Sequence, residues 1–424
     1  MSDHSRPPNA LRKVAASLRV WRERHRERHR PSGFDLALAD RVDFFDRLRW
    51  DDLTAGATLF LRRDVLRVIE RHGPDNITPR YAMIFRDDKP VAALAAQLVS
   101  VTGDRLSRDA KTRRGDGSSS LLRRTLSPAA KAASANVRDR VLIAGNLLSW
   151  GFHGIAFARD ENPAALWPGV AEALYRIRRA ERLAGETNFV LVKDVTEQQT
   201  GLEALRRFSY RPIAPEPNMV LTLNSAWQSY SDYLAALDAK YRRNAKEQLK
   251  KLAASGCTIE PLTDLATNAV RLHELYLAVH ERAPVRLVTL PEGLLPALAQ
   301  TLGADFRCTV VRRGERLLGF VTSLRDAETA IGYYIGFDRT AAAEGLPVYL
   351  SLLHRTIGDA IAWRCKRLSL GRTALEPKAA LGAKPEAMAW WVRHRVPAMN
   401  WLLRGLLGVV PHHQPPERNP FKAA

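Results

Sequence analysis

A series of elements occurs twice along this chain of 424 residues, and that repetition most limits the folds that it can adopt. "RYAMIFRDDKPVAALAAQL" begins at Arg80, and "RCTVVRRGERLLGFVTSL" begins at Arg307. Each reads as two apolar strands joined by a short charged turn. In each half a helical stretch, another apolar strand and a closing phrase follow; the closing phrases are "RRFSYRP" (206–212) and "AALGAKP" (379–385). The repeated order predicts two copies of one α/β domain.

The repeat also predicts where the domains begin and end. We expect a first domain over residues 36–225 and a second over residues 226–400. An insertion around 103–140 accounts for much of the greater length of the first copy, and its Gly, Ser and Arg content is typical of an exposed segment. A basic N-terminal arm is expected over residues 1–35, and a C-terminal helix or tail over residues 401–424.

The charge of the chain restricts its partners rather than its fold. The 65 Lys and Arg residues exceed the 45 Asp and Glu residues, which gives a formal net charge of +20. Such a charge attracts anions, and these include nucleic acid, phosphorylated cofactors and an anionic membrane surface.

Cysteine and histidine usage favours neither a disulfide framework nor a metal site. Cys257, Cys308 and Cys365 are odd in number and form no CxxC pair, which predicts free or buried thiols in a reducing compartment. The 11 histidines include no HExxH motif and no Cys/His cluster at zinc spacing. The N-terminus lacks the apolar core of a signal peptide, and no apolar run reaches the roughly 18 residues of a spanning helix. We therefore expect a cytoplasmic protein without metal or transmembrane segment.

The segment "DAKYRRNAKEQLKKLAASG" (238–256) has the charge of a DNA-binding helix. It predicts a helix, because it holds good helix formers and no Gly or Pro before Gly256. Tyr241, Ala245, Leu249 and Leu252 form one narrow apolar stripe, and the cations spread over the rest of the surface. A DNA recognition helix needs base-reading residues and a partner helix at a fixed turn, and neither is evident.

The same segment, extended to "YSDYLAALDAKYRRNAKEQLKKLAASG", resembles the start of the N-acyltransferase domains of Fem-type aminoacyltransferases and cellulose-biosynthesis acetyltransferase-like proteins. The resemblance continues through "AIGYYIGFDRT" and "EPKAALGAKPE", and it covers Trp227 to about Val396. The first half resembles the degenerate first copy of that family. The resemblance implies an α/β (α+β) fold of two tandem GNAT-like domains, each with a mixed central sheet flanked by helices.

The resemblance also implies where an acyl donor binds. In the GNAT fold a splayed strand offers backbone amides to the acyl carbonyl, and the next helix presents its N-terminus to a pyrophosphate. Here the strand is "AIGYYIGFDRT", in which Gly332 and Gly336 suit a bulge or a close backbone approach. Gly345, Leu346 and Val348 are the expected contacts to the donor. The usual basic Gly-x-Gly loop is absent, as in Fem-type enzymes, which take their acyl group from aminoacyl-tRNA.

Four side chains are further candidates for the site. Alternation along the strand points one of Tyr333 and Tyr334 into the core and the other into the cleft, and Tyr334 would protonate a leaving group. Lys378 falls on the family's lysine in "EPKAALG" and would stabilise an oxyanion. Glu281 would be a general base if burial raises its pKa. Arg372 would hold a phosphate or carboxylate of the substrate. Each also has a purely structural interpretation, as a packing aromatic, a surface lysine or a surface ion pair.

Three functions follow from these observations. The first is an N-acyltransferase that uses acyl-CoA and an amine on a small molecule or an envelope precursor, held in a groove between the copies that His153 would line. The second is a Fem-type aminoacyltransferase of cell-envelope biosynthesis, which would need charged tRNA. The third is a non-catalytic GNAT-fold module that binds nucleic acid or an anionic membrane, and the apolar tail "VPAMNWLLRGLLGVV" would allow peripheral membrane contact.

Overall fold

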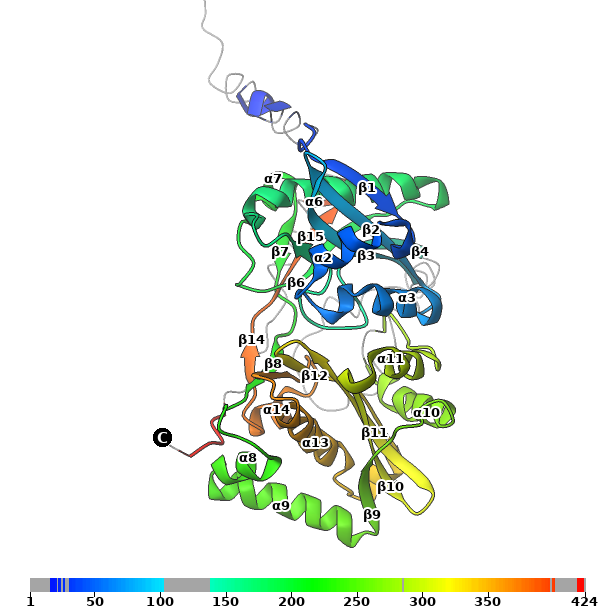
Figure 1. The fold of residues 1–424 in the computed structure, drawn as a ribbon, viewed down its shortest axis with the longest axis vertical. Coiled ribbons are helices and arrows are strands. Elements are labelled where there is room, and N and C mark those ends of the chain that lie inside the picture. Colours follow the sequence, from blue (N-terminus) through cyan, green and yellow to red (C-terminus); the bar gives the residue numbers. More distant parts are fainter. Residues whose placement is uncertain are drawn as a thin grey trace, which may run out of the picture.

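Two mixed β-sheets, each flanked by helices, make up the protein, and they form the upper and lower parts of Figure 1. The computed structural model describes residues 16–20, 22–23, 26, 30–102, 138–283, 286–396, 399–400 and 418–422. The predicted insertion and most of the predicted arm and tail lie outside these residues. The expected architecture of two mixed sheets in tandem is confirmed.

The elements of the first sheet and its helices, which we call the first half, come mainly from the N-terminal part of the chain. They are β1 (Asp35–Ala39), α2 (Arg47–Thr54), α3 (Arg63–His72), β2 (Ile77–Arg86), β3 (Lys89–Thr102), β4 (Arg138–Ala144), β5 (Ile155–Phe157), α6 (Pro163–Ala180), β6 (Phe189–Val195), α7 (Ala204–Arg207), β7 (Arg211–Ile213) and, from the end of the chain, β15 (Ala389–His394).

The second sheet and its helices form the second half. Its elements are β8 (Asn218–Thr222), α8 (Tyr230–Ala236), α9 (Ala239–Ala254), β9 (Cys257–Pro261), α10 (Ala269–His280), α11 (Leu294–Leu302), β10 (Phe306–Arg313), β11 (Arg316–Asp326), β12 (Thr329–Phe337), α12 (Arg339–Ala343), α13 (Val348–Ala362), β13 (Arg367–Ser369), α14 (Leu375–Ala380) and β14 (Lys384–Glu386). Among the described helices, none is long and apolar enough to cross a membrane.

The repeat in the sequence corresponds to a repeat of elements. β2 and β3 form the first predicted hairpin and β10 and β11 the second, and both pairs are antiparallel. α6 and α13 are the two predicted helices. β6, which follows α6, is parallel to β4, and β13, which follows α13, is parallel to β12. Both halves therefore have the same central topology.

The basic segment 238–256 folds as α9, at the lower edge of the second half in Figure 1. Ala245 and Leu252 of the predicted apolar stripe are buried, and Tyr241 and Leu249 are half-buried. Gly256 follows the helix with a φ of +70°, a conformation that favours glycine and stops the helix. The helix packs by one face, as the sequence predicts.

The two sheets exchange strands across the expected domain boundary. β15 lies in the first sheet between β6 and β7 and is antiparallel to both; it is the orange strand in the upper part of Figure 1. β8, which precedes residue 226, lies in the second sheet between β13 and β14. The sheets therefore do not follow the expected division into 36–225 and 226–400, because strand pairing returns the chain to the first sheet at Ala389.

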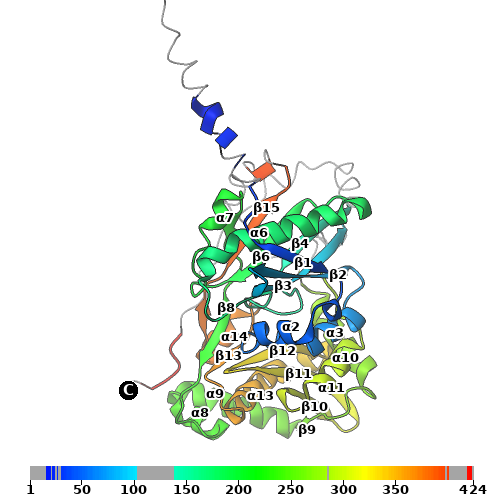
Figure 2. The ribbon, with the colours of Figure 1, turned by 45° about the horizontal axis from the view of Figure 1, so that its top comes forward.

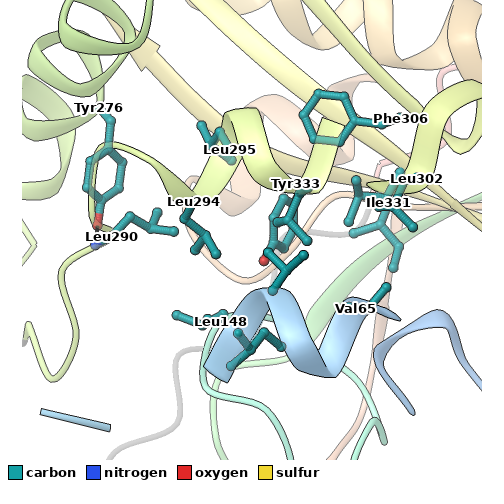
Figure 3. Packing of buried hydrophobic residues seen from close by; sticks show 14 of the residues in the cluster. Val65, Leu148, Tyr276, Leu290, Leu294, Leu295, Leu302, Phe306, Ile331 and Tyr333 are labelled. Carbon is teal, nitrogen blue, oxygen red and sulfur yellow. Dashed lines mark hydrogen bonds between the residues drawn. The ribbon is translucent and has the colours of Figure 1, made fainter. Parts of the chain in front are cut away.

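One hydrophobic cluster is shared by both halves. It brings α3 and the loop after β4 of the first half against α10, α11 and β12 of the second half. In Figure 3, Val65 and Leu148 of the first half face Leu294 and Tyr333 of the second. Removing apolar surface from water stabilises the folded state by about 25 cal/mol per Å². The junction is therefore a packed interior that fixes the positions of the two halves.

Candidate functional site

β12 and β13 separate after a short stretch of pairing. They are parallel, and their pairing runs only from Thr329 with Arg367 to Ile331 with Ser369. β12 continues to Phe337, whereas β13 ends at Ser369. We call the region between residues 332–337 and the chain that follows Ser369, where the two strands no longer pair, the β12–β13 opening. The resemblance implies that an acyl-binding strand is splayed at this place.

A β-bulge lies at the start of this opening. The register of β11 and β12 shifts between Val321 and Ser323, so that Thr322 lies opposite both Tyr333 and Tyr334. The Thr322 hydroxyl accepts a hydrogen bond from the Tyr334 N–H at 3.0 Å and donates one to the Tyr334 carbonyl at 3.2 Å. Buried backbone groups that lose their ladder partners need such substitutes. A threonine side chain therefore stabilises the bulge on which the opening depends.

The bulge overturns the expected alternation of the two tyrosines. In a regular strand neighbouring side chains point to opposite faces, but the ring centroids of Tyr333 and Tyr334 lie 4.5 Å apart. Burial raises the pKa of the Tyr334 phenol well above its ordinary value, so the phenol keeps its proton. The hydroxyl donates to the Leu148 carbonyl at 3.3 Å. Tyr334 lies beside the opening, and its role in catalysis stays a prediction.

A loop of the first half reaches the β12–β13 opening. It comprises residues 145–154, and Trp150 near its centre donates from the indole Nε1 to Ser369 Oγ at 2.9 Å. The Trp150 ring centroid lies 6.1 Å from that of Tyr333 and 6.4 Å from that of Tyr334. A Cβ at Gly371 would lie 3.1 Å from the indole Cε2, so this close approach requires glycine. Trp150 occupies the place where the two strands separate.

Arg372 contacts the first half instead of lining the opening. Its guanidinium donates a hydrogen bond to Asp194 of β6, and it lies 5.4 Å from the centre of the Trp390 ring of β15. A carboxylate of the protein already binds the Arg372 guanidinium, and the expected role of Arg372 in holding a phosphate or carboxylate of the substrate stays a prediction. The alternative of a solvated surface charge is wrong, since the ion pair is largely buried.

Asp194 is the centre of a buried ion cluster. It accepts hydrogen bonds from Lys193, from Trp390 Nε1 at 2.6 Å and from the Gly151 N–H at 2.9 Å, besides that from Arg372. Burial alone would raise the pKa of Asp194, but Lys193 and Arg372 lower it to about 2. Lys193 also donates to the Ser149 carbonyl at 2.7 Å. The cluster therefore holds loop 145–154 on both sides of Trp150.

Lys378 lies in α14, the helix that follows β13. Its side chain is only 3% exposed, which excludes the interpretation as a surface lysine. Burial lowers the pKa of its ammonium group to about 7, and the opposing effect of Glu216 is smaller. Its amine therefore exists in both charge states near neutral pH, and perturbed pKa values of this kind cluster at functional sites. Its catalytic role stays a prediction.

Glu281 is exposed at the C-terminal end of α10. Its expected role as a base required burial, and that burial is missing. Figures 1 and 2 show α10 and α14 on opposite sides of the second half. Glu281 therefore has the exposure of a helix-surface residue, and its role as a base stays a prediction.

The segment before α13 has the backbone freedom that the sequence predicts. Gly345 has a φ of +72°, Leu346 is half-buried, and Val348 is buried as the first residue of the helix. Pro347 is the N-cap residue and so lies just before the first turn. A Cβ at Gly345 would lie 3.4 Å from Nζ of Lys251 in α9. An ammonium group thus lies beside the segment that leads into a helix N-terminus, and both groups favour an anion.

A cleft of about 700 Å³ lies between the halves. Parts of the segment 47–67 line it from the first half, and the turn 325–327 and Trp363 line it from the second half. The Asp326 carboxylate in this cleft accepts hydrogen bonds from Thr58 Oγ1 at 2.6 Å and from the Leu59 N–H at 2.8 Å. Burial raises the pKa of Asp326 above its ordinary value. The cleft is where the sequence places a groove for the acceptor.

His153 links this cleft to loop 145–154. Its Nε2 lies 3.8 Å from the Asp326 carboxylate, and its ring stacks on Phe60 with centroids 4.6 Å apart. Its Nδ1 is 2.9 Å from Ser149 Oγ. Burial lowers the pKa of the imidazole to about 3, so the ring is neutral at physiological pH. His153 is therefore part of the packed junction between the copies.

Three residues of the junction were missed by sequence reasoning. Trp150 stands in "SWGFHG", where the expectation rested on the histidine alone. Asp194 could have been found, because "VKDV" places a charged pair inside an apolar strand, and buried charges need partners. The sequence around Thr322 does not indicate its role in the bulge, since threonine is common in buried strands.

Residues 239–379 match the family described as an acetyltransferase (GNAT) domain. The match runs from the start of α9 into α14 and includes the β12–β13 opening, Gly345 and Lys378. The second half therefore carries a GNAT domain, the domain of an acyltransferase family. No curated protein matches the chain significantly.

Solved structures match over most of the chain. FemX matches with a TM-score of 0.51 and 11% sequence identity, over 85% of this chain and 98% of that chain. A tandem GNAT protein from the clavulanic acid biosynthesis pathway matches with a TM-score of 0.47 and 13% identity, over 86% and 99%. The C-terminal domain of an Agrobacterium fabrum protein described as a lysylphosphatidylglycerol synthetase matches with a TM-score of 0.45 and 11% identity, over 84% and 94%. The likeness to FemX shows a common fold.

Proposed function

We propose that the protein is an N-acyltransferase whose second half moves an acyl group from an activated donor to an amine. The observation that carries the proposal is the β12–β13 opening, with the bulge that Thr322 stabilises, inside a GNAT domain. An acyl carbonyl laid against the open edge of β12 would meet backbone N–H groups that are fixed before the reaction. Such groups stabilise the oxyanion of an acyl-transfer intermediate.

The proposed reaction is an addition followed by an elimination. The amine nitrogen attacks the acyl carbon, the C–N bond forms, and the bond from that carbon to the donor's sulfur or oxygen breaks. The amine loses one proton and the leaving group takes one up. Tyr334, whose phenol stays protonated, is the proposed donor to the leaving group. Lys378 in its ammonium form is proposed to stabilise the oxyanion, and its pKa of about 7 makes this form half-populated near neutral pH.

Acyl-CoA is the first candidate donor. The start of α13 and the Lys251 ammonium beside Gly345 would hold its pyrophosphate. Leu346 and Val348 would then contact the donor through the backbone of the same segment. The donor's phosphate end would lie at the C-terminal end of β12, and its acyl end would point along the opening toward Ile331.

An aminoacyl-tRNA is the second candidate donor, and α9 favours it. Lys240, Lys246, Lys250 and Lys251 are exposed along this helix. A helix surface with several cations suits the phosphates of a nucleic acid. The absence of a Gly-x-Gly loop before α13 is consistent with this alternative, because a tRNA needs no dedicated site for a CoA pyrophosphate.

The acceptor amine is proposed to bind in the cleft between the halves. The Asp326 carboxylate there would attract the ammonium form of a small molecule or an envelope precursor. Cys257, Cys308 and Cys365 are free and buried, which agrees with the proposed cytoplasmic location. Peripheral contact with an anionic membrane is proposed only through the tail, which lies outside the described residues.

The test is to measure binding and turnover of purified full-length protein with acetyl-CoA, longer acyl-CoAs and a pool of aminoacyl-tRNA. We expect Tyr334→Phe and Lys378→Ala to reduce turnover while the far-UV circular dichroism stays unchanged. If no donor reacts and a polyanion binds with an affinity that falls on the order of a thousandfold from 50 to 200 mM salt, the protein is instead a non-catalytic binding module.

A further inference from the structure

We propose that Trp150, a residue of the first half, limits the size of the acyl group that the second half accepts. The inference rests on the proposed function and adds the substrate class to it. The indole lies at the narrow end of the β12–β13 opening, against Ser369 and Gly371 and beside the rings of Tyr333 and Tyr334. The wall that faces an acyl chain in one copy of the fold therefore comes from the other copy.

Hydrogen bonds fix the indole in this place. Trp150 Nε1 donates to Ser369 Oγ at 2.9 Å, and that hydroxyl donates to Asn218 Oδ1 at 3.1 Å. Asn218 Oδ1 also accepts from the Gly371 N–H at 3.0 Å. The indole thus belongs to a chain of buried polar groups that ties it to β8 and to the chain after β13. Buried polar chains of this kind hold side chains in one conformation.

The backbone on both sides of Trp150 is held as well. The Ser149 carbonyl accepts from Lys193, and the Gly151 N–H donates to Asp194. Lys193 and Asp194 are 4% and 0% exposed, so moving the loop would uncover a buried ion pair. Separating a buried ion pair destabilises the fold, because each charge then remains without its partner. Trp150 is therefore a fixed wall of the opening and not a lid that swings aside.

The direction in which the donor binds decides which part of the donor contacts Trp150. A donor whose anionic end lies at Gly345 and the start of α13 enters at the C-terminal end of β12. Its acyl carbon then lies against the bulge at Tyr334, and the rest of the acyl chain points toward the pair Ile331 and Ser369. The indole of Trp150 lies at that end. In the proposed arrangement a short acyl group would end before the ring, whereas a longer chain would collide with it.

The inferred substrate class is thus a donor with a short acyl group or a small aminoacyl group. One methylene group in an apolar pocket changes selectivity by about 10–200-fold. The full-length protein should therefore prefer acetyl-CoA to octanoyl-CoA strongly, and removing the indole should relax this preference.

The experiment compares the full-length protein with Trp150→Ala and Trp150→Phe. kcat/KM and Kd are measured for acetyl-, butyryl- and octanoyl-CoA. Trp227→Ala is the matched control, because Trp227 is also half-buried but packs against Tyr233 of α8 and Phe421. We expect Trp150→Ala to raise the octanoyl-to-acetyl ratio by at least about tenfold, Trp150→Phe to raise it less, and Trp227→Ala to leave it unchanged.

Each other outcome overturns a defined part of the argument. If Trp150→Ala reacts with both donors at the ratio of the unaltered protein, Trp150 does not limit acyl size. If Trp150→Ala fails to fold, as judged by circular dichroism, an unchanged ratio in Trp150→Phe and Trp150→Leu overturns the inference. If neither the variants nor the unaltered protein bind or use any acyl-CoA, acyl-CoA is not the donor, and the inference about Trp150 is overturned as well.

Discussion

Arg372 of the second half donates a hydrogen bond to Asp194 of the first half. The two residues stand at related places, because each lies just beyond the last parallel pair of its strand, Val192 with Ala144 and Ser369 with Ile331. Trp150 makes the reverse contact, from the loop after β4 to the opening after β13. Each copy therefore places side chains against the end of the parallel strand pair of the other copy.

We expect Asp194→Asn to destabilise the protein by about 3–5 kcal/mol at pH 7, because it leaves Lys193 and Arg372 buried without their carboxylate. The folded pKa of Asp194, about 2, is lower than that of an unfolded aspartate. Its stabilising contribution is therefore present above the unfolded pKa and is lost as pH falls toward 2. Denaturant titrations from pH 7 to pH 2 measure both effects.

The control for this prediction is Asp75→Asn, which changes an exposed carboxyl group of the first half. It should leave the denaturation midpoint almost unchanged at every pH. Equal midpoints for Asp194→Asn and the unaltered protein at pH 7 would show that the ion cluster contributes no net stability.

Lys378→Met should abolish turnover and raise stability at the same time. Folding removes the ammonium group from water, which lowers the pKa of Lys378 to about 7. Between pH 7 and the unfolded pKa near 10.4 the unfolded chain binds more protons, so the stability of the unaltered protein rises with pH across that window. The variant lacks this rise and should be more stable at pH 7 by on the order of a few kcal/mol.

The pH dependence of turnover tests the same residue independently. If the ammonium form of Lys378 stabilises the oxyanion, kcat/KM falls as pH rises through about 7, since the charged form is lost there. A pH–rate profile from 5.5 to 9 measures this limb. Lys378→Arg stays charged over the range and should lack the limb, whatever its absolute rate. A profile that rises through 7 would instead make Lys378 a base.

Thr322→Val should weaken the bulge and lower kcat. The valine has nearly the same shape but cannot bond to the N–H and carbonyl of Tyr334. Leaving such buried groups unsatisfied costs about 1–3 kcal/mol, and the displaced backbone lowers turnover further. Thr309→Val, at an equally buried threonine of β10, is the control. Loss of stability in both variants to the same extent would mean that the bulge has no special need for Thr322.

Charge reversal on α9 separates the two candidate donors. Lys251→Glu places a carboxylate beside Gly345 and should raise KM for acyl-CoA by roughly tenfold. Lys240→Glu, at the other end of the helix, should leave KM for acyl-CoA unchanged. With an aminoacyl-tRNA donor both variants should raise KM, because a nucleic acid contacts several cations along the helix. An unchanged KM for both donors in Lys251→Glu would remove α9 from donor binding.

The sequence predicted the elements better than it predicted their connections. The two hairpins, the helices α6 and α13 and the stop at Gly256 follow from local rules of periodicity and backbone preference, which a single sequence carries. The place of β15 does not, because "AWWVRH" reads as an ordinary strand and nothing local tells which sheet will receive it. Pairing partners far apart in the chain are decided by the packing of the whole molecule.

In the candidate site, too, local features could be predicted from the sequence and long-range contacts could not. Lys378 and the β12 strand were found through a resemblance, and the burial of Lys378 agrees with a special role. The ion pair of Arg372 and the exposure of Glu281 could not be predicted, because ion pairing and burial depend on residues that are distant in the sequence. Tyr333 and Tyr334 were given opposite directions, since alternation holds only where the ladder is regular and Thr322 marks the place where it is not.

The place of β15 decides when the protein can fold during its synthesis. β6 and β7 leave the ribosome early, but the strand that belongs between them is made near the end. Domains usually fold as they emerge, whereas here the place between β6 and β7 stays empty until β15 has been added. A gene split after residue 225 would yield one product without β15 and another without β8, so that each fragment would lack a strand of its own sheet.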